Sequence, residues 1–238
     1  MTNSSLPRRD RRILKMGMSE FWSGDLGLTL LSISLLILIF IVFPLREAGI
    51  LGRIFFDLTI VTLMILGTFA VHQSRAITIL TIVVVLAAIV ALIAGRVHPG
   101  LLIHELGSLL STVALLIYIR IVLLIMFRAG RVTWSRIQGG VCAYLLIGMA
   151  WGSAYELLEE LSPGSFHFVS TPESLDQLTS KLTYFSFSTL TTVGFGDVTP
   201  LHPFARSLTI AEAITGQLFP AILIGALVAM AIQSTGKS

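Results

Sequence analysis

The chain has 238 residues, of which 55% are hydrophobic and 12% are charged, and its formal net charge is +3. Soluble domains carry about 25% charged residues, so the composition excludes an ordinary soluble protein. Two stretches, 26–45 and 76–95, contain no charged residue, and each has the length of about 20 residues that a helix needs to cross a bilayer. We therefore expect an all-α membrane protein that contacts lipid and has no nucleic-acid partner, its basic excess reflecting membrane topology.

Six stretches of the sequence are apolar enough to form transmembrane helices. They are 26–43, 54–71, 77–94, 109–127, 141–158 and 208–232. The connections between them are short, except for the segment 159–207 between the fifth and the sixth helix. An even number of helices places both termini on the same side of the membrane.

Lysine and arginine residues are distributed unevenly between the two sides of this arrangement. Ten lie on the side of the termini, namely Arg8, Arg9, Arg11, Arg12, Lys15, Arg75, Arg128, Arg131, Arg136 and Lys237. Five lie opposite, namely Arg46, Arg53, Arg96, Lys181 and Arg206. Because basic loops stay on the cytoplasmic side, we expect a multi-pass protein of the plasma or inner cell membrane with both termini in the cytoplasm.

The long connection becomes apolar again before the sixth helix, without being long enough to cross the membrane and return. Thr171 and Pro172 offer an N-cap and a first helical position, which predicts a short helix from there, or from Leu178, to Thr191. Such a re-entrant helix is tolerated only where its backbone is buried in protein or lines a wet cavity.

The stretch TTVGFGD at 191–197 follows this predicted helix. Gly194 and Gly196 permit the positive φ that other residues avoid, and alternating such residues turns successive carbonyls toward one side. A row of carbonyl oxygens can bind a dehydrated cation, and four chains around an axis would complete the row into rings.

The residues 192–197, Thr-Val-Gly-Phe-Gly-Asp, resemble the selectivity filter of the tetrameric potassium channel superfamily, with Phe in place of the usual Tyr. The resemblance extends over 181–232 and implies a homotetramer that conducts K⁺ passively and needs no organic cofactor. It implies that the filter is formed by Thr192, Val193, Gly194, Phe195 and Gly196, with K⁺ bound at the first four. It implies that the filter is supported by Asp197, Tyr184 and Thr191.

The predicted helices and their topology, together with the resemblance over 181–232, suggest an organisation along the chain. A basic cytoplasmic N-terminus would occupy 1–25, a four-helix transmembrane domain 26–136, and a short cytoplasmic tail 233–238. The pore domain, 137–232, would contain an outer helix, the re-entrant pore helix, the filter loop and an inner helix.

Two aromatic positions depart from the pattern of the superfamily. Tyr184 and Phe185 stand where two tryptophans are common, and Phe195 has no hydroxyl to offer to an aromatic cuff. Tyr184 can still form a hydrogen bond with Asp197. The departures concern the rigidity of the filter and do not by themselves remove potassium selectivity.

The sequence supports a prediction about voltage gating and names candidates for a gating hinge. Arg120 is the only arginine within the fourth predicted helix, whereas steep voltage sensing needs several, so we expect little voltage dependence. Gly216 and Pro220 are candidates for a gating hinge in the sixth helix, with close packing as the other interpretation. The stimulus, including a regulatory partner, is left open.

Three other functions compete with a potassium channel. A non-selective monovalent cation channel is the alternative, because small changes in the filter alter selectivity in this superfamily. An intramembrane enzyme is less favoured: His104 and Glu105 begin a zinc-protease motif, but Ser108 stands where the second histidine is needed. A transporter-like potassium subunit would carry several diverged pore loops in one chain, and this chain has one.

Overall fold

The computed structural model describes residues 27–48, 50, 79, 82–83, 86–87, 90, 101–126 and 134–235. The described elements are α2 (Gly27–Ile37), η2 (Leu38–Val42), α3 (Phe43–Glu47), α6 (Leu101–Met126), α7 (Trp134–Leu161), β1 (Phe166–Phe168), α8 (Leu175–Leu190), β2 (Val198–Pro200) and α9 (Pro203–Thr235). The predicted second helix and nearly all of the third lie outside the described residues, as do the N-terminal segment 1–25 and the last three residues of the tail.

Within this part of the chain, three helices are long and apolar enough to cross a membrane: Thr29–Glu47, Arg136–Leu161 and Pro203–Ile232. They correspond to the first, fifth and sixth predicted helices. The fourth corresponds to α6, whose apolar stretch Thr112–Leu124 is shorter. Helix α9 begins at Pro203 and not at 208, because a proline fits the first turn of a helix, where its missing N–H is not needed.

The first helix changes its hydrogen-bond pattern midway. The π-helical segment η2 lies between α2 and α3 and ends two residues before Pro44, which has no N–H to donate to the preceding turn. The wider turn thus lies where an α-helical hydrogen bond cannot form. Beyond it, Phe43 still faces the protein core, and Arg46 at the end of α3 reaches α8.

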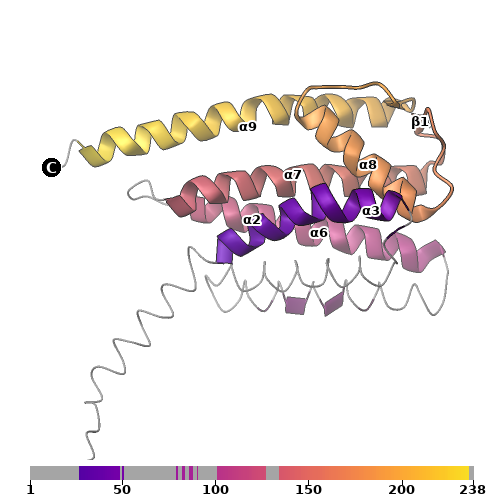
Figure 1. Cartoon of the computed structure of the whole chain (residues 1–238), viewed down its shortest axis with the longest axis horizontal. Coiled ribbons are helices and arrows are strands. Elements are labelled where there is room, and N and C mark those ends of the chain that lie inside the picture. Colours follow the sequence, from indigo (N-terminus) through magenta and orange to yellow (C-terminus); the bar gives the residue numbers. More distant parts are fainter. Residues whose placement is uncertain are drawn as a thin grey trace, which may run out of the picture.

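Helices α2 and α6 both pack against α7, as Figure 1 shows. Their shared core contains Leu31, Leu35, Leu38, Val42 and Phe43 from the first helix, Ala114, Tyr118, Ile121 and Val122 from α6, and Cys142, Ala143, Leu146 and Met149 from α7. Residues on both sides of the expected domain boundary at 136 therefore belong to one core, while the division itself stays a prediction.

Helix α8 lies between α7 and α9, with its N-terminal end against α3 (Figure 1). The predicted cap at Thr171 and Pro172 is wrong, because the helix begins at Leu175 and ends at Leu190. Ser174 is the N-cap: its hydroxyl accepts the N–H of Gln177 at 3.3 Å. The side chain of Gln177 in turn accepts the N–H of Glu173 at 2.8 Å, so two N–H groups at the helix start are satisfied.

The expectation of an all-α fold needs one correction. Strands β1 and β2 pair antiparallel, with Phe166 opposite Pro200 and Phe168 opposite Val198. The N–H of Val169 extends the pairing to the carbonyl of Asp197, at 3.0 Å. Short extended segments on either side of α8 and the segment 191–197 thus satisfy each other's backbone groups, and the chain that follows 191–197 is held against the loop after α7.

Candidate functional site

The backbone of the segment 191–197 alternates in conformation. Gly194 and Gly196 have φ of +59° and +82°, the positive values that the sequence analysis expected. Thr192 also has positive φ, +59°, although it is β-branched, so every second residue from 192 to 196 is left-handed. Alternating left- and right-handed residues let successive carbonyls point the same way.

One residue, Ser188 in the last turn of α8, holds three consecutive N–H groups of this segment. Its carbonyl accepts the N–H of Val193 at 2.9 Å and that of Gly194 at 3.2 Å. Its hydroxyl accepts the N–H of Phe195 at 3.3 Å. The donors of the segment therefore face α8, and Ser188 is buried while residues 191–197 are exposed within the single chain.

The carbonyls of the same residues have no such partners. Across the described residues, no hydrogen bond is donated to the main-chain oxygens of residues 192 to 195. By contrast, the last carbonyls of α8 are all occupied: those of Phe187, Ser188 and Thr189 accept N–H groups from residues 191–194, and that of Leu190 accepts the Tyr144 hydroxyl. Within the described part of the chain, the N–H groups of residues 193 to 195 are thus held by α8, while the carbonyls of residues 192 to 195 remain open.

An aromatic side chain of α8 stacks on an aromatic side chain of the segment 191–197. The rings of Tyr184 and Phe195 stack with centroids 5.9 Å apart. Partial burial raises the pKa of Tyr184 above its ordinary value, and hydrogen bonding and charge from Asp197 raise it further. Tyr184 and Asp197 thus interact, while their support of a filter stays a prediction. Phe185, in contrast, packs inward against Tyr155 and Phe166.

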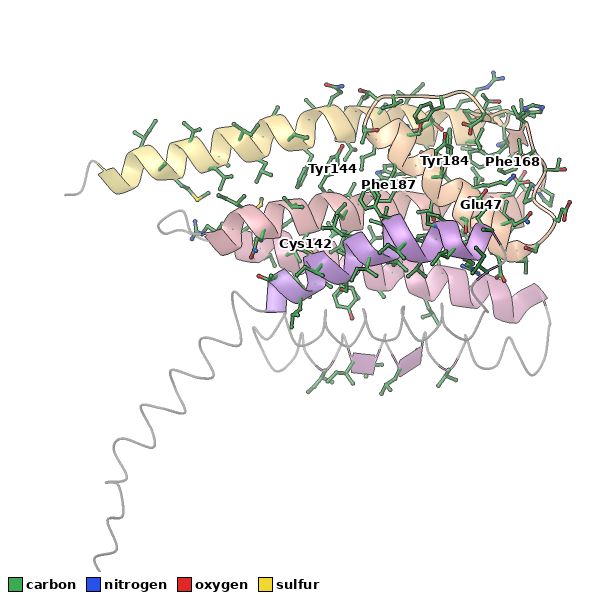
Figure 2. The ribbon with its side chains drawn as sticks, in the orientation of Figure 1. Glu47, Cys142, Tyr144, Phe168, Tyr184 and Phe187 are labelled. Atoms are coloured by element: carbon green, nitrogen blue, oxygen red, sulfur yellow. The ribbon has the colours of Figure 1, made fainter. Side chains whose placement is uncertain are left out.

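Close approaches of backbone fix α8 between its neighbours. On α7, a Cβ at Gly148 would lie 2.6 Å from the ring of Phe187, and one at Gly152 would lie 3.0 Å from the Cα of Thr183. Figure 2 shows Tyr144 of α7 by the C-terminal end of α8, where its hydroxyl donates to the Leu190 carbonyl at 3.2 Å. The glycines of α7 thus let the two helices meet at backbone distance.

The two hinge candidates lie within a continuous helix. Helix α9 runs through Pro220 without interruption. A Cβ at Gly216 would lie 1.8 Å from the carbonyl oxygen of Leu190, so this position accepts glycine alone in the observed packing. Close packing is therefore sufficient to account for Gly216, and a role in gating stays a prediction.

A buried carboxylate joins three helices behind the segment. Glu212 of α9 is 0% exposed and accepts hydrogen bonds of 2.5 Å from the Tyr155 hydroxyl of α7 and from the Ser186 hydroxyl of α8. A carboxylate at membrane depth is costly unless it is paired, and these two hydroxyls supply the partners that the sequence did not reveal. Ser186 lies one half-turn before Ser188, so the network reaches the residue that holds the N–H groups of residues 193 to 195.

Four residues of this site escaped the sequence analysis: Ser188, Ser186, Tyr155 and Gln217. The last donates from its Nε2 to the Thr192 hydroxyl at 3.1 Å. The hydroxyl-rich sequence of α8 was the available signal for the two serines, because small polar residues at membrane depth need a partner. The side chains of His104 and Glu105 are outside the described residues, and the described part of the chain contains no cluster of three or more His, Cys, Asp or Glu that could hold a metal.

Residues 143–233 match the family model described as ion channel. The match covers α7 from Ala143 on, the strand pair, α8, the segment 191–197 and α9 up to Gln233. No curated protein and no solved structure matches the chain. The part of the chain that contains residues 191–197 is therefore similar to an ion-channel domain, and two of the three helices that are long and apolar enough to cross a membrane lie largely within it.

Proposed function

We propose that the ion-channel domain at 143–233 forms a potassium-selective pore, through which K⁺ passes without chemical change. Four copies of the chain would surround the pore in a plasma or inner cell membrane. K⁺ would bind at Thr192, Val193, Gly194 and Phe195, with Gly196 at the outer mouth and with Asp197, Tyr184 and Thr191 in support.

One observation carries this proposal: the main-chain N–H groups of residues 193 to 195 are held by Ser188, while the carbonyls remain open. Positive φ at Thr192, Gly194 and Gly196 is the conformation that such a row requires. Carbonyl oxygens replace the water around a dehydrated K⁺ in potassium channels, and their number and field strength favour K⁺ over Na⁺.

The exposure of the single chain supports an assembly of several copies. One row of oxygens can contact a cation from one side only, so further rows must complete its coordination. Only 6% of the most apolar stretch of α9 is buried within the chain. Val193 and Phe195 are 56% and 68% exposed. These surfaces need neighbours, which lipid supplies for α9 and further copies of the chain would supply for the filter segment.

The alternative is a pore that does not distinguish K⁺ from Na⁺. Phe195 favours it to some extent, since its ring stacks on Tyr184 of the same chain but has no hydroxyl to brace the filter. Purified protein in liposomes, with K⁺ or Na⁺ flux measured separately, decides between the two. Selective K⁺ flux supports the proposal and equal fluxes support the non-selective channel. If neither ion passes, both channel functions are contradicted and an intramembrane enzyme is the remaining candidate.

A further inference from the structure

Thr192 is the one residue other than glycine that has positive φ in the described part of the chain. A β-branched residue reaches this conformation only at a cost in free energy, so the surrounding structure must hold it there. Part of this hold is local, because the N–H of Thr192 donates to the Thr189 carbonyl at 2.9 Å. The hydroxyl of Thr192, however, is held from a different helix.

The hydroxyl oxygen of Thr192 accepts a hydrogen bond from Nε2 of Gln217, at 3.1 Å. Gln217 belongs to α9 and is 25 residues away along the chain. Across the described residues, this is the hydrogen bond that connects a side chain of α9 to the segment 191–197. The inner helix therefore touches the proposed filter at its innermost residue.

The neighbouring glycine explains why this contact is possible. Gly216 lets the backbone of α9 approach the Leu190 carbonyl so closely that a Cβ would lie 1.8 Å from that oxygen. Any larger residue at 216 would push α9 away from the end of α8. The next residue, Gln217, would then lose its reach to Thr192.

A hydroxyl oxygen has two lone pairs and one hydrogen. The N–H of Gln217 occupies one lone pair of Thr192, which fixes the orientation of the oxygen and leaves the second lone pair for a cation. We propose that Gln217 is a positioning residue: it holds the Thr192 hydroxyl for the innermost cation site and thereby contributes to the discrimination between K⁺ and Na⁺. A ligand oxygen that is held in place adapts less readily to a smaller cation, as partners of ligands do in metal sites. This inference rests on the proposed function.

The test compares four variants of the full-length chain with the wild type in liposomes by their K⁺-to-Na⁺ flux ratio. Gln217→Met keeps an unbranched side chain of similar length and removes the donor. Thr192→Val keeps the branched shape and removes the acceptor. The double variant combines them. Thr215→Val is the matched control, because the Thr215 hydroxyl is on the same helix but donates to Ala211 of its own helix, at 2.8 Å.

We expect Gln217→Met to lower the flux ratio by about threefold to tenfold, the range for losing one hydrogen bond. Thr215→Val should leave it unchanged. In the Thr192→Val background, adding Gln217→Met should change the ratio no further, because the hydroxyl through which Gln217 acts is already absent. Melting temperatures of the assembled protein, measured in parallel, separate this effect from a general loss of stability.

A selective wild-type protein whose flux ratio is unaffected by Gln217→Met overturns this inference alone. So does an equal loss of ratio from Gln217→Met in the wild-type and Thr192→Val backgrounds, since that effect would not pass through the hydroxyl. A wild-type protein that conducts both ions equally overturns the proposed function instead.

Discussion

The hydroxyl of Tyr155 donates a hydrogen bond of 2.5 Å to the carboxylate of Glu212, which has no exposed surface. Only Ser186 shares this carboxylate as a donor in the hydrogen bonds of the described residues. The pair connects α7 to α9, and Ser186 joins α8 to it. Loss of the Tyr155 hydroxyl should therefore lower the stability of the packing of these three helices.

Tyr155→Phe should lower the free energy of unfolding by about 1–3 kcal/mol, because a fully buried carboxyl group loses a hydrogen-bond donor. Tyr144→Phe, on the same helix, should cost only about 0.5–1.5 kcal/mol, since the Tyr144 hydroxyl donates to a neutral carbonyl at 3.2 Å and is only half buried. Thermal unfolding in detergent measures both. Equal losses would mean that Glu212 does not depend on Tyr155.

Gly196→Ala and Gly164→Ala form a matched pair. Both glycines have positive φ, +82° and +84°, and neither has a neighbour within 4 Å of an added Cβ. Each alanine should destabilise the protein by about 1–2 kcal/mol through backbone strain. Only Gly196→Ala should remove most of the potassium flux in liposomes, because Gly164 lies in the turn after α7. Similar flux from both variants would contradict an ion path along residues 192–196.

Voltage should change the conductance only weakly. Arg120 is an exposed residue of α6, and one charge per chain does not give steep voltage dependence. Recordings in planar bilayers over a wide voltage range should give a shallow conductance–voltage curve, and Arg120→Gln should not alter its slope. A curve that requires several gating charges per subunit would refute this prediction.

Asp176→Asn should weaken the attachment of the first helix to α8. The Asp176 carboxylate, in the first turn of α8, forms a salt bridge with Arg46, whose side chain is only 8% exposed. Loss of this charged partner should cost about 1.5–3 kcal/mol in thermal unfolding. Glu173→Gln is the control, since Glu173 is exposed and also lies beside the start of α8. A comparable loss from Glu173→Gln would point to the helix terminus and not to the salt bridge.

The raised pKa of Tyr184 predicts that the protein loses stability at alkaline pH. Partial burial and Asp197 raise its pKa above the ordinary value of 10.0, so the folded protein favours the protonated hydroxyl. The resulting stability is present at neutral pH and is lost as pH rises above about 10 through the raised pKa. The difference in melting temperature between wild type and Tyr184→Phe should therefore be constant up to about pH 10. Above that pH, the melting temperature of the wild type should fall relative to that of the variant. A difference that does not vary with pH would contradict this assignment.

The positions of the spanning helices follow from the sequence because a bilayer demands long apolar runs, whatever the tertiary contacts are. The positive φ within residues 191–197 follows for a similar reason, since glycines at 194 and 196 mark backbone that most residues avoid. Two nearby caps, Thr171 and Ser174, could each have started α8, and the helix uses Ser174. The spacing of Ser174 and Gln177 was the better signal than Thr171 and Pro172, because it satisfies two N–H groups at once.

The contacts of Gln217 and Glu212 could not be predicted from the sequence, because they depend on which helices become neighbours. The hydrogen bond from Gln217 to Thr192 exists only because α9 approaches α8 at Gly216. The partners of Glu212 come from two helices, α7 and α8, at residues that look like ordinary membrane-helix side chains. The strands β1 and β2 have three residues each, too few for a pattern of alternation to stand out.

The π-helical turn at Leu38–Val42 also bears on what insertions and deletions the first helix tolerates. Each residue of a regular helix advances the chain by about 100° around its axis. A turn closed by i→i−5 hydrogen bonds holds one residue more than an α-helical turn, so removal of one residue from it would leave a regular α-helix with Arg46 still on the side of Asp176. Removal of one residue from α2 would instead rotate everything after it by that angle and separate the contacts of Arg46 from those of Leu31.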